Sequence, residues 1–207
     1  MKNNKFSDNL TKSIIKIAAY LALKDWNNLD SELKNYISNN YNLQFVDEIF
    51  LTSYLFLGFP AMITAFEMLR QSSTHKSKFK LNRKNNYSYW KNKGLKLFRK
   101  IYDDKSEKLL LKVKKLHPEV ANWMLTEGYG KVLSRKFLPI NIREIIIITF
   151  LIINYYPKQL YSHLKGALNV GVSTNEINIL FLTLKEININ NQNISAALEM
   201  WQSINNL

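Results

Sequence analysis

Three histidines, His75, His117 and His163, are the side chains of this 207-residue sequence best suited to exchange protons near neutral pH. His163 lies within residues 159–173, where apolar side chains recur mostly at three- and four-residue spacing, as on one face of a helix. The chain has no cysteine, which excludes disulfides, thiolate metal sites and thiol-based redox or nucleophilic chemistry. Because the histidines show no metal-ligand spacing, we expect neither a metal nor any other cofactor.

The helix that carries His163 has clear start and stop signals. Pro157 suits its first turn, where the missing N–H is not needed, and Gly171 suits its end, because glycine tolerates the left-handed conformation. Ser173 and Glu176 then match a capping box for the next helix. His163 lies on or beside the apolar face, so a satisfied core or interface histidine is the alternative interpretation.

The composition favours a folded chain with a real core, since 46% of the residues are hydrophobic and 13% aromatic. The longest aliphatic run, residues 145–153, is too short to span a bilayer and suits a buried helix. The N-terminus lacks the apolar core of a secretion signal. We therefore expect a cytoplasmic protein without a membrane partner.

The net charge of +13 is concentrated in one region. Residues 71–115 hold fifteen Lys or Arg against three acidic residues, and no nucleic-acid-binding motif accompanies them. We interpret this segment as a solvated basic surface rather than a nucleic-acid interface.

The sequence contains a degenerate internal copy. Aligning residue n with residue n+131 from Lys12 to about Met68 needs no gap and gives twelve identities over about sixty positions. This register indicates a duplication, with a first repeat at 1–70, a basic loop and connecting helices at 71–139, and a second repeat at 140–207, forming one compact unit. Strand signals are weak throughout, so the expected fold class is all-α.

Helical periodicity predicts helices in both repeats and in the connection. Residues 71–89 are expected to form a loop, 128–130 a break, and 135–139 the entry into the second repeat. The expected helices are 9–24, 29–39, 44–69, 90–102, 106–116, 118–127, 141–155, 157–170, 174–186 and 192–204.

Several of these segments resemble the carboxymuconolactone decarboxylase/AhpD-like superfamily. The second repeat has Arg143-Glu144, the 159–171 stretch and the 173–177 segment, while the first has 47–49 followed by Gly58-Phe59-Pro60. The resemblance implies a tandem member of the family, and a trimer of tandem chains that forms a pseudo-hexamer. It also implies that one pocket combines the histidine helix of the second repeat with the Gly58 helix of the first.

AhpD-like members use a Cys-x-x-Cys pair with a glutamate and a histidine as proton relay. In this sequence the relay positions fall on Glu144 and His163, but the cysteine positions fall on Tyr156 and Gln159. A thiol peroxidase or disulfide reductase is therefore excluded. The corresponding positions of the first repeat are Ser13, Asp25, Asn28 and Glu32.

The decarboxylase members imply a different chemistry, a cysteine-independent lyase acting on a small lactone or carboxylic acid. His163 would be the general acid or base and Glu144 its partner, while Arg135 or Arg143 would clamp the substrate carboxylate. Tyr156 and Gln159 would contact the substrate.

Each of these residues also has a structural interpretation. Glu144 completes a capping box with Asn141, Arg143 is a surface residue of a first turn, and Tyr156 and Gln159 cap or pack at a helix start. The alternative function is a non-catalytic helical scaffold or small-ligand binding protein of the same fold.

Overall fold

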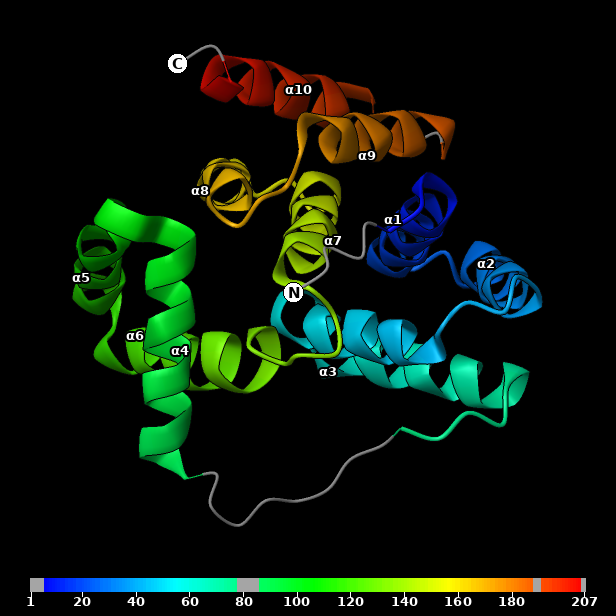
Figure 1. Ribbon diagram of the computed structural model, residues 1–207, viewed down its shortest axis with the longest axis horizontal. Helices are drawn as coiled ribbons and strands as arrows, with labels where there is room; N and C mark the ends of the chain where they lie inside the picture. The colour runs from blue at the N-terminus through cyan, green and yellow to red at the C-terminus, as the bar shows by residue number, and fades with distance from the viewer. Residues whose placement is uncertain (1–5, 78–85, 188–190, 206–207) are drawn as a thin grey trace.

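The computed structural model describes residues 6–77, 86–187 and 191–205, and every regular element in these ranges is a helix (Figure 1). The predicted all-α class is confirmed. The elements are α1 (Asp8–Leu23), α2 (Trp26–Ser38), α3 (Leu43–Ser72), α4 (Tyr87–Tyr102), η1 (Asp103–Lys105), α5 (Ser106–Leu116), α6 (Pro118–Trp123), η2 (Met124–Leu133), α7 (Ile140–Ile153), α8 (Pro157–Asn169), α9 (Thr174–Glu186) and α10 (Asn191–Asn205).

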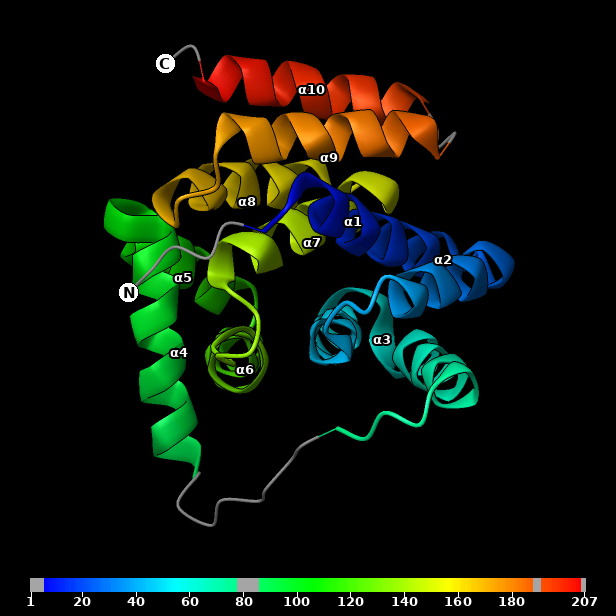
Figure 2. The same cartoon turned by 45° about the vertical axis from the view of Figure 1, so that its right-hand side comes forward.

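Helix α7 lies at the centre of the molecule, between α1, α3 and α8, and α9 and α10 cover α7 and α8 on one side (Figure 2). Its aliphatic run is apolar on all sides, as expected of a helix surrounded by others. Eleven of its fourteen residues are buried, and these include Arg143 and Glu144. Two adjacent charged side chains therefore enter the interior from one helix, in different directions.

Helix α3 is bent at Gly58, where φ is 79°, and Pro60 follows two residues later. Among the described helices, α3 alone is long and apolar enough to cross a membrane by length and composition, with 33% of the relevant window buried. Core helices of soluble proteins meet the same criterion, and α3 packs on α1, α2 and α7. The cytoplasmic location remains a prediction.

The break predicted at residues 128–130 is wrong, because these residues lie inside the π-helix η2, which continues α6. Gly130 instead serves the crossing of η2 with α4, together with Gly94 on α4. A Cβ on Gly94 would lie 1.8 Å from the carbonyl oxygen of Leu125, and one on Gly130 would lie 2.4 Å from that of Trp90. Glycine at both positions lets the two backbones approach closely, which offsets its poor helix propensity.

The local signals around α8 are confirmed. Pro157 is in the first turn of α8, Gly171 follows the helix with φ 87°, and Ser173 and Glu176 form the capping box of α9. The predicted loop at 71–89 is shorter than expected, since α3 reaches Ser72 and α4 begins at Tyr87, and its residues 78–85 lie outside the described ranges.

Candidate functional site

Glu144 and His163 form a buried hydrogen-bonded pair between α7 and α8. The Nδ1 atom of His163 lies 2.8 Å from Oε2 of Glu144, and the two residues are 7% and 0% exposed. The capping-box alternative for Glu144 is wrong, because α7 begins after Pro139 with no side-chain cap. When Nδ1–H of His163 donates its hydrogen bond to Oε2 of Glu144, the Nε2 lone pair is left available on the opposite side of the ring.

Two tyrosines from the connecting region face that side of the imidazole. The hydroxyl of Tyr102, at the end of α4, lies 3.4 Å from Nε2 of His163 and 2.7 Å from the hydroxyl of Tyr129 on η2. A continuous series of a carboxylate, an imidazole and two phenols is thereby enclosed in the protein. The hydrogen bonds of such a series polarise one another, and in the low dielectric of the interior they are electrostatically stronger than in water.

Burial keeps both phenols protonated. Desolvation raises the pKa of Tyr102 and of Tyr129 above the ordinary value, and the nearby negative charge of Glu144 raises both further. Each hydroxyl is therefore a neutral donor over the whole physiological range of pH.

Close helix packing brings Tyr102 to His163. Gly166 on α8 faces Ile101 on α4, and a Cβ on this glycine would lie 2.5 Å from the Ile101 side chain. Tyr102 follows Ile101 directly, and Asn169 of α8 donates to the carbonyl oxygen of Ile101 at 2.8 Å. The end of α4 is thus attached to the helix that carries the histidine.

One oxygen of Glu144 has no partner. Oε1 is buried and accepts no hydrogen bond from the described part of the chain, whereas Oε2 binds His163. A buried acceptor without a donor costs about 1–3 kcal/mol. Such a group calls for an explanation, and a role in proton exchange or ligand binding beside the His163 imidazole is one.

Helix α3 supplies an aromatic wall. The ring of Phe56 stands edge-on to His163 with centroids 6.2 Å apart, and Phe150 of α7 lies next to it. Phe56 comes two residues before Gly58. Helix α3 therefore contributes to the surroundings of His163, while a pocket shared by the two helices remains a prediction.

Arg135 and Arg143 lie in a separate cluster around Glu48 of α3. Arg143 is 0% exposed, forms an ion pair with Oε2 of Glu48, and donates to Oγ1 of Thr52 at 2.9 Å. The Nε atom of Arg135 lies 2.9 and 3.0 Å from the two oxygens of Glu48. Arg143 is thus not the surface residue of the alternative interpretation, and both guanidinium groups already hold a carboxylate.

This arginine cluster carries one more positive than negative charge. Burial lowers the pKa of Arg143, while the charge of Glu48 opposes that effect. The Nε–H of Arg143 has no partner in the described part of the chain. Glu48, Thr52 and Phe56 recur every four residues along one face of α3, so this face runs from the arginine cluster to His163.

Tyr156 and Gln159 lie elsewhere, at the exposed start of α8. Tyr156 is 52% exposed and lines a cavity of about 10 Å³ with Leu160 and Met200, a volume that holds at most one water. Gln159 is exposed. The structure therefore brings Glu144 together with His163, and Arg135 together with Arg143. Tyr156 and Gln159 lie apart from both pairs.

No protein-family model matches the sequence, and no curated protein matches it either. The family resemblance therefore remains a prediction that rests on the quoted motifs.

The sequence analysis missed three partners of the candidate residues. Glu48 lies in a segment quoted for the resemblance and Tyr129 in the expected break, but neither received a role, and Tyr102 carried no signal beyond its place at a helix end. Their contacts join residues 27 to 95 positions apart in the chain. No local pattern indicates pairs at such separations.

Proposed function

We propose that the protein is a cysteine-independent acid/base catalyst of the carboxymuconolactone decarboxylase-like type, acting on a small lactone or carboxylic acid. The observation that carries the proposal is the buried pair of Glu144 and His163, with its unpartnered carboxylate oxygen and the adjoining Tyr102 hydroxyl. In this role Nε2 of His163 takes a proton from the substrate or returns one to it. Glu144 orients the imidazole, and Tyr102 donates to the charge that develops on the substrate oxygen.

The arginine cluster supports an anionic substrate. Arg135 and Arg143 share one carboxylate, so the cluster is left with a net positive charge. It lies on the same face of α3 as Phe56, which stands next to His163. Arg135 is partly exposed, with 25% of its side chain accessible. It is therefore the arginine better placed to bind an incoming carboxylate, while Arg143 holds Glu48 in position.

A duplicated fold is part of the proposal. Helices α1 and α7, at corresponding places of the two repeats, pack on one another, and each packs on the third helix of the other repeat, α9 and α3 (Figure 1). The offset of 131 residues also aligns the kink of α3 at Gly58 with the interval between the end of α9 and the start of α10. These reciprocal contacts are those expected of two repeats about a pseudo-twofold axis.

The alternative is a non-catalytic helical scaffold or ligand-binding protein, and one observation favours it. His163 is closed off, and neither of the two cavities described in this structure is lined by His163 or Glu144. Catalysis therefore requires that a covering element move, and the candidates are Tyr102 with the end of α4 and Phe56 on α3.

We also infer self-association, as the resemblance implies for a tandem chain. Phe59 and Ile63 on the second half of α3 are 57% and 50% exposed, which leaves apolar surface for a partner copy. Light scattering tests this directly, with three chains as the expected assembly and a monomer as the result that contradicts it.

The catalytic proposal is tested by incubating the protein in D₂O with 4-carboxymuconolactone and with a panel of small lactone acids and oxo acids. NMR follows loss of the carboxylate and exchange of C–H protons for deuterium. We expect His163→Asn to lower the rate by about 10²–10⁴-fold, the usual contribution of a general acid or base. Glu144→Gln should lower it as well, since the amide no longer fixes the tautomer.

His117→Asn is the matched control, because His117 is exposed and an asparagine can still cap α6. Circular dichroism establishes that each variant is folded. An unchanged rate in folded His163→Asn would refute the catalytic role, and failure of the native protein to turn over any panel member would favour the scaffold.

A further inference from the structure

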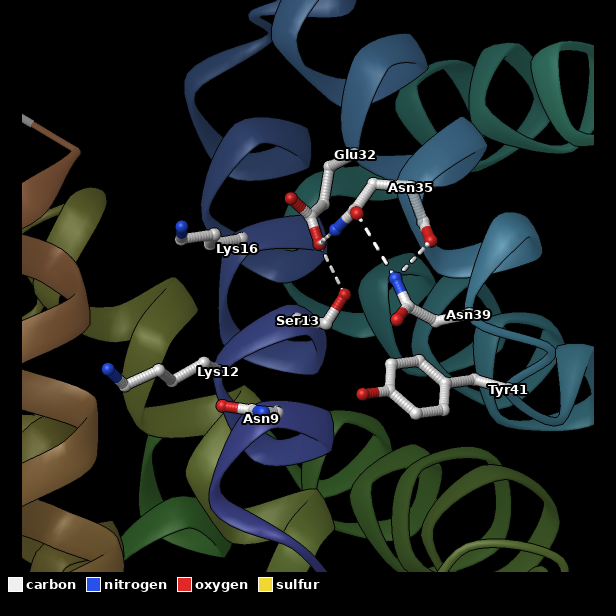
Figure 3. Close-up of a pocket in the computed structure, with 8 residues that line it drawn as sticks. All are labelled: Asn9, Lys12, Ser13, Lys16, Glu32, Asn35, Asn39 and Tyr41. Atoms are coloured by element: carbon white, nitrogen blue, oxygen red, sulfur yellow. Dashed lines mark hydrogen bonds between the residues drawn. The ribbon is translucent and has the colours of Figure 1, made fainter.

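A cavity of about 240 Å³ lies between α1 and α2, away from His163 (Figure 3). Its floor contains Ser13, which is buried and donates a hydrogen bond to Oε1 of Glu32. Ser13 and Glu32 occur 131 positions before Glu144 and His163, so the two hydrogen-bonded pairs are at equivalent places. The pair in the second half of the chain is covered by Tyr102, whereas the pair in the first half opens into a cavity.

Polar groups that point into the cavity have spare hydrogen-bonding capacity. Ser13 and Nδ2 of Asn35 both donate to Oε1 of Glu32, whereas Oε2 accepts no hydrogen bond from the described residues. The hydroxyl of Tyr41 makes no hydrogen bond within the described ranges, and the Oδ1 of Asn39 accepts none there either. A carboxylate oxygen, an amide oxygen and a phenol together match a ligand with several hydroxyl groups.

Two lysines supply positive charge at the side of the cavity nearest α9. Lys12 and Lys16 are one turn apart on α1, and each ammonium nitrogen lies 3.8 Å from a carboxylate oxygen of Glu186. These distances are longer than the 2.7–2.9 Å typical of a charge-assisted hydrogen bond. Glu186 is itself about half exposed, so solvent screens both contacts. The lysines can therefore turn to an anionic group at little cost.

We propose that this cavity binds a small anionic polyol, such as a sugar phosphate or a sugar acid. The hydroxyl groups of the ligand bind Glu32, Asn39 and Tyr41, and its acid group binds Lys12 and Lys16. The volume is below the range of about 300–1,000 Å³ usual for larger ligands, which limits the occupant to the size of a single sugar unit. The proposal does not depend on catalysis at His163.

Calorimetric titration with four probes tests it. Glucose 6-phosphate and gluconate carry both hydroxyls and an acid, glucose carries only hydroxyls, and inorganic phosphate carries only the acid. We expect one of the first two to bind with a Kd of about 1 mM or tighter, and both glucose and phosphate to bind at least about tenfold more weakly. Which of the two binds more tightly identifies a phosphate or a carboxylate as the anionic group.

The double variant Lys12→Ala/Lys16→Ala should weaken the tighter probe by at least about tenfold. Its matched control is Lys108→Ala/Lys112→Ala, which removes the same charge from two exposed lysines one turn apart on α5. If circular dichroism shows that the alanine variant is unfolded, Lys12→Gln/Lys16→Gln replaces it. The proposal is overturned if none of the probes binds, if phosphate alone binds as well as the sugar derivatives, or if both double variants weaken binding equally.

Discussion

Replacing Glu48 by glutamine should destabilise the protein severely although the side chain keeps its shape. Glu48 is 0% exposed and is the shared anion of Arg135 and Arg143. The amide retains an acceptor but not the negative charge, so the fully buried guanidinium of Arg143 loses its counter-ion. Removal of one partner from a buried ion pair costs about 3–5 kcal/mol.

Urea denaturation followed by circular dichroism measures this loss as a fall in the free energy of unfolding. The melting temperature should fall by about 6–20 °C, because each kcal/mol shifts the melting temperature of a domain of this size by about 2–4 °C. The matched control is Glu107→Gln. Glu107 accepts from Nε and Nη2 of Arg99 at 3.1 and 2.8 Å, but both side chains are more than half exposed. The Glu107→Gln variant should lose no more than about 1 kcal/mol of its free energy of unfolding.

A second variant separates the charge effect from general damage to the core. Glu48→Met/Arg143→Met removes both charges of the fully buried ion pair. It should therefore be less destabilised than Glu48→Gln alone. The reasoning is refuted if Glu48→Gln loses no more stability than Glu107→Gln, or if the double variant is the less stable of the two.

Two further predictions concern the crossing of α4 with η2. Gly94→Ala should lower the free energy of unfolding by about 3 kcal/mol or more, because its Cβ would meet the Leu125 carbonyl oxygen. Gly128→Ala is the control: its Cβ would meet nothing within 4 Å, so the change should be neutral or stabilise by about 0.5–1 kcal/mol. Equal urea midpoints for the two variants would contradict this. Because burial raises the pKa of Tyr102 and Tyr129, the folded chain keeps protons that the unfolded chain releases from about pH 10 upward. The free energy of unfolding should therefore fall above pH 10 by about 1.4 kcal/mol per pH unit for each tyrosine. In Tyr102→Phe/Tyr129→Phe it should fall less steeply. If urea denaturation at several pH values gives the same slope for this variant and the native protein, the linkage is contradicted.

The sequence alone determined the helical class and the ends of α8. Pro157, Gly171 and the capping box of Ser173 with Glu176 act through the backbone of neighbouring residues, so their effect can be predicted without the rest of the fold. The absence of cysteine excluded thiol chemistry in the same direct way, since it depends on residue type and not on position.

Only the tertiary structure decided what each charged or polar side chain binds. Glu144 and Arg143 are adjacent in the sequence, yet one pairs with His163 and the other with Glu48, because the two side chains leave α7 toward different helices. The glycines at 128 and 130 indicated a break by local propensity, yet both lie inside η2, where Gly130 meets the backbone of α4 closely. Such pairings depend on how distant helices pack, and the spacing of residues along one helix carries no information about the helix it will meet.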